Sequence, residues 1–158
     1  MSTLHFITYE QASTEQQATF AQFNLAWIEQ YFVVEAKDQY TLYHPYEAII
    51  AQGGQVLFGI NDQGESVITC ALLLESDGRF ELSKMGMKPS EKGQGYAEKI
   101  VIATIKQARS MGANIVFLES NRILTNALYI YEKCGFEEVP MLPSPYARAD
   151  IRMELTLG

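Results

Sequence analysis

The segment Met87-Lys-Pro-Ser-Glu-Lys-Gly-Gln-Gly-Tyr-Ala97 carries residue types that suit the binding of a phosphorylated ligand. It joins an apolar run, residues 80–87, to an amphipathic run, residues 96–111. A turn between a strand and a helix exposes backbone N–H groups, and the helix N-terminus adds partial positive charge at the same point. Gly93 and Gly95 have no Cβ, so a ligand can approach the main chain closely. We therefore predict that a phosphorylated cofactor binds at this turn.

The details of the turn exclude two common phosphate-binding loops and favour a third. A dinucleotide fingerprint needs a small residue three places after Gly95, where this chain has Glu98. An ATP- or GTP-binding loop needs Gly-Lys-Ser/Thr, which the sequence lacks. The turn resembles instead the acyl-CoA loop of the GNAT acetyltransferases, Arg/Gln-x-x-Gly-x-Gly/Ala, with Lys92, Gly95 and Ala97 at its key positions. Lys92 departs from the usual Arg or Gln, because it keeps the charge but not the planar guanidinium.

A second motif lies one predicted helix and one predicted strand after this loop, in Ala127-Leu-Tyr-Ile-Tyr-Glu-Lys-Cys-Gly-Phe136. It resembles the other GNAT signature, Ala-x-x-Leu-Tyr-Glu-Lys-x-Gly-Phe, with Ile130 in place of the leucine. An ordinary helix with a glycine cap explains Gly135 but not Tyr131. Two motifs in this order are more specific than either alone, and the chain resembles the GNAT family over residues 80–139.

The resemblance implies acetyl-CoA as the cofactor. It places the pyrophosphate on backbone amides of residues 92–97, and the thioester carbonyl on N–H groups of the preceding strand. Many family members carry an asparagine before the second motif, where this chain has Leu124, and Asn121 or Asn126 is the candidate to replace it. The cofactor-binding residues implied in this way are Met85, Met87, Lys92, Gly93, Gln94, Gly95, Tyr96, Ala97 and Asn126.

Acetyl transfer to an amine needs a proton donor for the leaving thiolate and a base for the attacking amine. The resemblance assigns the donor to Tyr131, a phenol with an ordinary pKa of about 10. Glu81 lies on the strand leading to the loop and is the first candidate for the base, because strand alternation can point it across the sheet. Glu119, at the end of the next strand, is the second candidate. The alternative for each carboxylate is a solvent-facing or salt-bridged role.

The acceptor-binding residues are predicted from the places that line the cleft in the family. The proline-rich segment 141–146 and the residues after it lie there, and Arg148 or Arg152 can pair bidentately with a substrate carboxylate. His44 is expected at the start of a helix that overhangs the cleft. The predicted acceptor-binding residues are Glu119, His44, Tyr146, Arg148 and Arg152, with ordinary packing as the alternative for each.

Hydrophobic periodicity predicts the elements that must position these residues. Helices are expected after a capping box at Ser13 and Gln16, from Pro45 to the glycines 53 and 54, and over residues 96–111 and 125–134. Strands are expected over residues 4–9, 56–60, 66–74, 79–87, 114–118, 136–139 and 151–157. The order β-α-α-β-β-β-α-β-α-β-β predicts an α/β (α+β) fold, a GNAT-like three-layer sandwich with a mixed sheet of about six or seven strands and about four helices.

Composition sets outer limits on this interpretation. A chain of 158 residues with 47% hydrophobic and 20% charged residues predicts one globular domain over residues 1–158. The net charge of −7 argues against a nucleic-acid partner. The sequence has neither a membrane-spanning apolar stretch nor a secretory signal, and its two cysteines fit a reducing cytoplasm, so we expect a cytoplasmic protein without a membrane partner. His5 and His44 stand far apart, and no metal site is expected.

The resemblance thus implies an acetyl-CoA-dependent N-acetyltransferase. It would transfer an acetyl group to the amine of a small molecule or amino-acid-like acceptor, by direct attack on the thioester. One alternative is a protein or peptide N-acetyltransferase, because the acidic first half of the chain would attract a basic peptide. The other is a non-catalytic acyl-CoA-binding regulatory domain, which Leu124 favours and Tyr131 disfavours. Family members often dimerise, so a homodimer is an open option.

Overall fold

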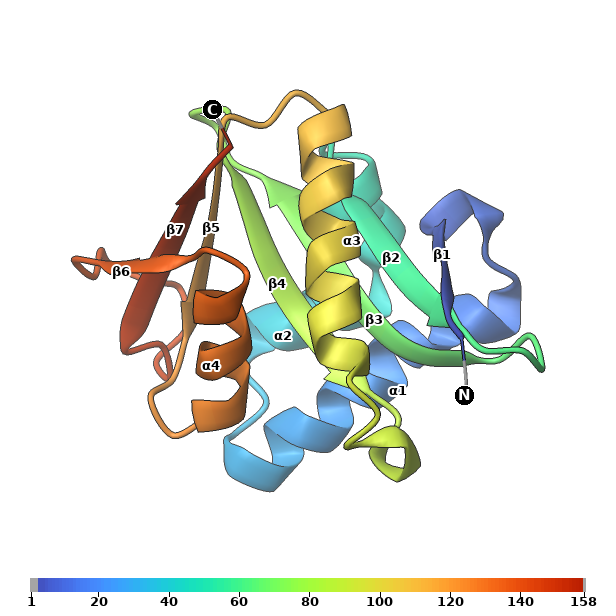
Figure 1. Ribbon diagram of the computed structural model, residues 1–158. Coiled ribbons are helices and arrows are strands. Elements are labelled where there is room, and N and C mark those ends of the chain that lie inside the picture. Colours follow the sequence, from blue (N-terminus) through green and yellow to red (C-terminus); the bar gives the residue numbers. More distant parts are fainter. Residues whose placement is uncertain (1–2, 158) are drawn as a thin grey trace.

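The computed structural model describes residues 3–157, in which seven strands form one mixed sheet (Figure 1). The strand order is β1-β2-β3-β4-β5-β7-β6. Every neighbouring pair is antiparallel except β4 and β5, which run parallel. The strands are β1 (His5–Thr8), β2 (Gln55–Ile60), β3 (Ser66–Leu74), β4 (Phe80–Met87), β5 (Ile115–Ser120), β6 (Glu137–Val139) and β7 (Ile151–Thr156).

Two α-helices cover each face of this sheet. Figure 1 shows α3 and α4 in front of the sheet, and α1 and α2 behind it. The predicted layered sandwich is therefore confirmed. The helices are α1 (Thr14–Tyr31), α2 (Ala36–Tyr43), α3 (Tyr96–Ser110) and α4 (Thr125–Lys133), with short turns η1 (Tyr9–Gln11), η2 (Tyr46–Ile50) and η3 (Pro89–Glu91). No helix within residues 3–157 has both the length and the apolar character that crossing a bilayer requires.

The start of α1 follows the predicted capping box. Ser13 Oγ accepts a hydrogen bond from the Gln16 amide at 3.1 Å, and Gln16 Oε1 accepts one from the Ser13 amide at 2.8 Å. These two bonds satisfy donors that every helix N-terminus leaves free. Along the helix, Phe20, Phe23 and Ile28 are buried at helical spacing, so this face of α1 packs on the sheet.

The helix predicted to start at Pro45 is present as the short turn η2, but the helix α2 before it was not predicted. The helix α2 ends at Tyr43, and Pro45 begins the separate π-helical turn η2. Proline breaks a helix because it lacks an N–H and its ring clashes with the preceding turn. The start of α2 is fixed instead by the Glu35 amide, which donates to Asp38 Oδ2 at 2.9 Å. Asp38 is therefore inside the helix, where the sequence patterns did not place it.

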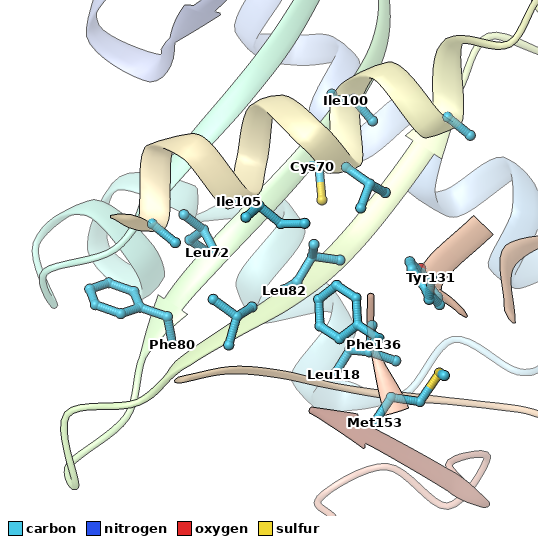
Figure 2. Packing of buried hydrophobic residues seen from close by; sticks show 14 of the residues in the cluster. Cys70, Leu72, Phe80, Leu82, Ile100, Ile105, Leu118, Tyr131, Phe136 and Met153 are labelled. Atoms are coloured by element: carbon cyan, nitrogen blue, oxygen red, sulfur yellow. The ribbon is translucent and has the colours of Figure 1, made fainter. Parts of the chain in front are cut away.

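The sheet separates two hydrophobic clusters. The first lies between the sheet and the helices α3 and α4, and Figure 2 shows Ile100 and Ile105 of α3 packed over Leu72 and Leu82 of the sheet. Tyr131 lies at the edge of this cluster (Figure 2). The second cluster, on the opposite face, holds α1, α2 and η2 against the sheet through Phe20, Ile28, Leu42, Ile49 and Phe58.

The strand β4 opens the sheet at its centre. Its pairing with β5 is confined to Phe80 with Val116 and Glu81 with Phe117. Beyond these pairs the two strands diverge, as Figure 1 shows. The rest of the β4 edge that faces β5 therefore has no strand partner.

A bulge in β4 accompanies this divergence. The register between β3 and β4 shifts, so that Thr69 pairs with Gly86 and Ala71 with Ser83. The extra residue on β4 leaves Lys84 at φ +55°, the only positive φ of a non-glycine residue within residues 3–157. A bulge bends a strand and redirects its side chains. Lys84 thereby reaches a helix on the α1–α2 face of the sheet, as its contact with Asp38 shows.

Candidate active site

A cavity of about 210 Å³ lies where β4 and β5 diverge. Its volume is about seven times the roughly 30 Å³ that one water molecule occupies in the liquid. The walls come from β4, the end of β5, α4, the end of α1 and the segment after residue 145. The predicted site residues that line it are Glu81, Met85, Met87, Lys92, Ala97, Glu119, Tyr131, Tyr146 and Arg148.

The glycine-rich turn adjoins this cavity through Lys92 and Ala97. Gly93 has φ +85° and Gly95 has φ +80°, in the left-handed region that favours glycine. A Cβ added to either would meet no atom within 4 Å, so the space beside the main chain is open. The amides of Gly93, Gln94 and Gly95 have no backbone acceptor within residues 3–157. These donors, next to the start of α3, suit an anion such as a pyrophosphate.

The edge of β4 offers a second set of backbone donors. Met85, Gly86 and Met87 line the cavity along the part of β4 that has no pairing with β5. Gly86 is required by packing on the other face, because a Cβ there would lie 2.9 Å from the backbone of Phe23 and of Asn24 in α1. The helix α1 therefore supports β4 from behind, and the front edge stays open to a ligand.

The hydroxyl of Tyr131 is held protonated by its surroundings. The residue is only 7% exposed, and its ring makes an edge contact with Phe136 at a centroid distance of 5.9 Å. Burial raises the pKa of Tyr131, and the nearby Cys70 adds to the increase. Because the phenol stays neutral at physiological pH, it can donate a proton into the cavity.

Unlike the Tyr131 hydroxyl, which stays protonated, the Glu81 carboxyl group gains and loses a proton near neutral pH. Burial raises the pKa of Glu81 to about 7, and the charge of Glu119 contributes to the shift. No hydrogen bond or ion pair holds this carboxylate within the described part of the chain. An unpaired carboxylate with a pKa near the working pH has the properties of a general base.

Glu119, the second candidate for the base, is held by other groups. It accepts a hydrogen bond from Ser144 Oγ at 2.7 Å and lies 3.5 Å from Arg152 Nη1. These contacts involve both carboxylate oxygens and restrict the orientation of the side chain. The structure therefore supports Glu81 over Glu119 as the base.

The part of the cavity lined by Trp27, Phe32, Tyr146 and Arg148 is called the acceptor side below. The sequence analysis missed a buried ionic cluster next to it. Asp38 is fully buried, and its Oδ1 accepts hydrogen bonds from Lys84 Nζ at 2.6 Å and from Arg148 Nη2 at 2.7 Å. Its Oδ2 accepts another from Arg148 Nη1 at 2.8 Å. Tyr146 covers both cations, with Lys84 Nζ at 4.3 Å and Arg148 Cζ at 4.6 Å from the ring centroid. We call Asp38, Lys84, Tyr146 and Arg148 the Asp38 cluster.

The Asp38 cluster changes the expectation for Arg148 and Arg152. Both Nη atoms of Arg148 are already bound to Asp38, so they are not free for a substrate carboxylate. Arg152 lies outside the cavity, 3.5 Å from Glu119 and from Glu154, with its guanidinium 4.0 Å over the ring of Phe117. Arg148 therefore has no free fork for a bidentate contact. Arg152 Nε and Nη2 have no hydrogen-bond partner within residues 3–157, but this side chain is buried outside the cavity, where a ligand in the cavity does not reach it.

Two further predicted residues lie outside the cavity. His44 follows α2, with its ring 5.5 Å from Tyr40, and does not line the site. Asn126 is exposed on the first turn of α4. Leu124 and Asn121 do line the cavity, but Asn121 Nδ2 already donates to the Arg148 carbonyl at 2.7 Å.

Sequence patterns also missed Trp27 and Phe32, which line the acceptor side of the cavity. Trp27 lies on α1, and Phe32 follows that helix. One signal for the Asp38 cluster was present in the sequence. Lys84 lies within the apolar strand of residues 80–87, and a lysine inside a buried strand needs a buried anion. Strand alternation would place it on the face of Phe80 and Leu82, but the bulge turns it to the opposite face.

Most of the chain resembles one known protein family. Residues 17–136 match the profile of the Acetyltransferase (GNAT) family. Over 95 residues the chain is 39% identical to the uncharacterized N-acetyltransferase YjgM of Escherichia coli K12. The aligned region covers 58% of this chain and 56% of that protein. Over 81 residues it is 30% identical to the [ribosomal protein bS18]-alanine N-acetyltransferase of Haemophilus ducreyi, covering 51% and 54%. The chain thus spans just over half the length of these relatives.

Solved structures share the fold at low sequence identity. A GNAT-family acetyltransferase from Staphylococcus aureus Mu50 superimposes with a TM-score of 0.85 at 18% identity, covering 99% of this chain and 100% of that one. Salmonella typhimurium YncA, solved with acetyl-CoA, gives 0.74 at 17% identity, covering 99% and 94%. A Bacillus subtilis acetyltransferase, solved with CoA, gives 0.72 at 18% identity, covering 98% and 99%.

The Asp38 cluster generates a prediction about stability. Burial alone would raise the pKa of Asp38, but hydrogen bonds from Arg148 and Lys84 outweigh it and lower the pKa from 3.8 to about 2. A lowered pKa stabilises the fold above the unfolded value, and this contribution of about 2 kcal/mol is lost as the pH falls through about 2. Replacing Asp38 by Asn leaves two buried cations underpaired, so we expect a loss of about 3–5 kcal/mol at pH 7.

Urea unfolding of the wild type and Asp38→Asn at several pH values measures this effect. The difference in unfolding free energy should shrink as the pH is lowered from about 5 towards 2. Asp62→Asn, at an exposed position, is the matched control and should change stability by less than about 0.5 kcal/mol. Equal effects of the two substitutions at pH 7 would contradict the assignment.

Proposed function

We propose that this chain, which belongs to the GNAT family of acetyltransferases, transfers the acetyl group of acetyl-CoA to the amine of a small-molecule acceptor. The observation that carries the proposal is one cavity that joins three features. These are the free amides of the glycine-rich turn, the protonated hydroxyl of Tyr131, and the unpaired carboxylate of Glu81. A cavity that contains an acid and a base, and that adjoins free amide donors, is what acetyl transfer to an amine requires.

The residues of the cavity fit acetyl-CoA, which supplies an activated acetyl thioester. The amides of Gly93, Gln94 and Gly95 and the first turn of α3 would hold the pyrophosphate, with Lys92 adding charge. The free edge of β4 between Met85 and Met87 would present N–H donors to the thioester carbonyl. Tyr96 contributes only its backbone, because its ring is 2% exposed in the core. Asn126 stays a proposed contact, and Leu124 removes one polar contact.

Two side chains of this chain would move the protons. The Glu81 carboxylate takes the proton of the acceptor ammonium, so that a neutral amine with a free lone pair attacks. The Tyr131 hydroxyl gives its proton to the departing sulfur. The raised pKa values of both groups match these roles, because one is a stronger base than an ordinary carboxylate and the other stays protonated.

A peptide acceptor is the second candidate. The Haemophilus relative is named as an acetyltransferase of an alanine in a ribosomal protein, which favours a protein N-terminus. Thiol release from acetyl-CoA with a panel of amines, amino acids and peptides separates the two candidates. Cofactor binding without turnover on any member of the panel would support a regulatory acyl-CoA-binding domain instead.

A substitution in the glycine-rich turn should weaken cofactor binding alone. Gly95→Ala adds a methyl group in the space beside the free amides, at φ +80°. We expect the dissociation constant for CoA to rise about tenfold, a loss of about 1.4 kcal/mol. Gly78→Ala is the matched control, because Gly78 has φ +87° and equally open surroundings in a distant turn. Isothermal titration calorimetry should show normal CoA binding for Gly78→Ala, and no CoA binding by the wild type would refute the cofactor proposal.

The assigned proton donor predicts a defect confined to turnover. Tyr131→Phe keeps the edge contact with Phe136 but removes the hydroxyl, so kcat should fall about 10²–10⁴-fold with unchanged CoA affinity. Tyr129→Phe, at a residue that is 63% exposed on the same helix, should behave like the wild type. Steady-state rates and calorimetry together test this, and a Tyr131→Phe enzyme with full kcat would exclude the role.

The assigned base predicts a change in the pH profile. In the wild type, kcat/KM should fall as the pH drops through about 7, because protonated Glu81 cannot accept a proton. Glu81→Gln should lower kcat/KM by about 10²–10⁴-fold and abolish this acid limb. Glu137→Gln, at an exposed position on β6, should preserve both rate and profile. If the limb near pH 7 survives in Glu81→Gln, another group is the base.

A further inference from the structure

Both cations that line the acceptor side of the cavity, Lys84 and Arg148, are compensated by the protein, and the nearby Lys37, with Nζ 5.9 Å from the Tyr146 ring centroid, is exposed and does not line the cavity. Lys84 and Arg148 share Asp38, and Arg148 Nη1 also lies 3.5 Å from Glu35. Arg152, just outside the cavity, is compensated by Glu119 and Glu154 at 3.5 Å each. An acceptor that carries a carboxylate would therefore find no free cation to pair with.

One carboxylate on the same side has no such partner. Glu81 lines the cavity without a hydrogen bond or an ion pair from any other residue in 3–157. Glu119, the other carboxylate in the cavity wall, is held by Ser144 and Arg152. The acceptor side thus offers one negative charge to a ligand, and this charge is matched by a single ammonium group.

The remaining wall is aromatic, with its polar atoms already bonded. Trp27 Nε1 donates to Asn24 Oδ1 at 2.9 Å, so the indole presents only its apolar surface. Phe32 packs edge-on against Trp27 at a centroid distance of 6.2 Å. Tyr146 Oη is 3.1 Å from Lys84 Nζ, which turns that hydroxyl towards the Asp38 cluster. Aromatic walls with no free donor or acceptor favour an apolar body in the ligand.

We propose that the acceptor is a small monoamine with an apolar body and no carboxylate, whose ammonium pairs with Glu81 and whose body lies against Trp27 and Phe32. This inference rests on the proposed function and narrows its acceptor. It disfavours free amino acids, because their carboxylate would meet Glu81 and Glu119 while Arg148 is occupied. It also disfavours polyamines, because a second cation has no second free carboxylate.

Trp27 provides a direct test, because it is the only tryptophan of the chain. Quenching of its fluorescence reports amine binding without turnover, and the titrations are run with and without CoA at pH 7.5, where most of Glu81 is ionised. Each dissociation constant is referred to the protonated fraction of the amine, because the α-amine of phenylalanine amide is partly neutral at this pH. The probes are 2-phenylethylamine, phenylalanine amide, phenylalanine and spermidine. Phenylalanine amide and phenylalanine differ in the carboxylate alone, so this pair isolates the predicted discrimination.

We expect 2-phenylethylamine and phenylalanine amide to bind at least about tenfold more tightly than phenylalanine and spermidine, in either cofactor state that supports binding. The same order should appear in kcat/KM for thiol release from acetyl-CoA. Binding of phenylalanine or spermidine as tight as that of 2-phenylethylamine would overturn the inference, and so would the absence of saturable binding by every probe. Turnover of any amine would uphold the proposed function in all these cases, so the two can fail separately.

Two variants test the charges themselves. Glu81→Gln should weaken 2-phenylethylamine binding about tenfold, to the level of the uncharged 2-phenylethanol. Asp38→Asn should release Arg148 and narrow the difference between phenylalanine and its amide. Glu81→Gln removes an unpaired buried charge and should fold, so it keeps the test decisive if Asp38→Asn is unstable. An unchanged affinity for 2-phenylethylamine in Glu81→Gln would refute the pairing.

Discussion

The short pairing between β4 and β5 is the constraint on which the rest of the molecule depends. These parallel strands share two residue pairs and then separate at the centre of the sheet. Separation inside a sheet is costly, because buried backbone groups lose their partners. Here α1 packs closely against Gly86 from behind, and the bulge at Lys84 bends β4 away from β5. The free edge thus becomes a row of donors that face a cavity. A fold with a fully paired sheet would have neither the cavity nor the donors.

Two buried carboxylates near this opening have opposite pKa shifts. Burial raises the pKa of both, and their different partners decide the net direction. Asp38 is fully buried between two cations, and their hydrogen bonds hold its pKa at about 2. Glu81 has no cation bound to it, and burial with the nearby Glu119 raises its pKa to about 7. Both follow from one rule, that a low-dielectric site destabilises a charge unless an opposite charge is in contact. The same opening therefore contains a permanent anion and a carboxylate ready to exchange a proton.

Local signals in the sequence were enough to predict most of the framework. The capping box at Ser13 acts within one turn of helix, and the glycines at 93 and 95 are needed for left-handed backbone that no other residue adopts easily. Pro45 correctly indicated the start of η2, whereas α2 was missed because Asp38 caps its start only through a hydrogen bond from the Glu35 amide. The Asp38 cluster was out of reach for a different reason. Asp38 and Arg148 lie 110 residues apart in the sequence, and only the folded chain brings them together.

The family match covers all residues at the cofactor end of the cavity but only some of those at the acceptor side. The match to the family spans residues 17–136, which includes the glycine-rich turn, β4 and Tyr131. Tyr146 and Arg148 lie beyond it, although they line the acceptor side together with Trp27, and the buried Asp38 holds Arg148 in place. A fold shared at 18% identity preserves the layers and the opening, not the side chains that face an acceptor. The choice of acceptor therefore depends on the charges and contacts of this chain's own side chains. The decisive contacts are those of Asp38 and Glu35, whose two negative charges already balance Lys84 and Arg148, the cations that an anionic acceptor would need.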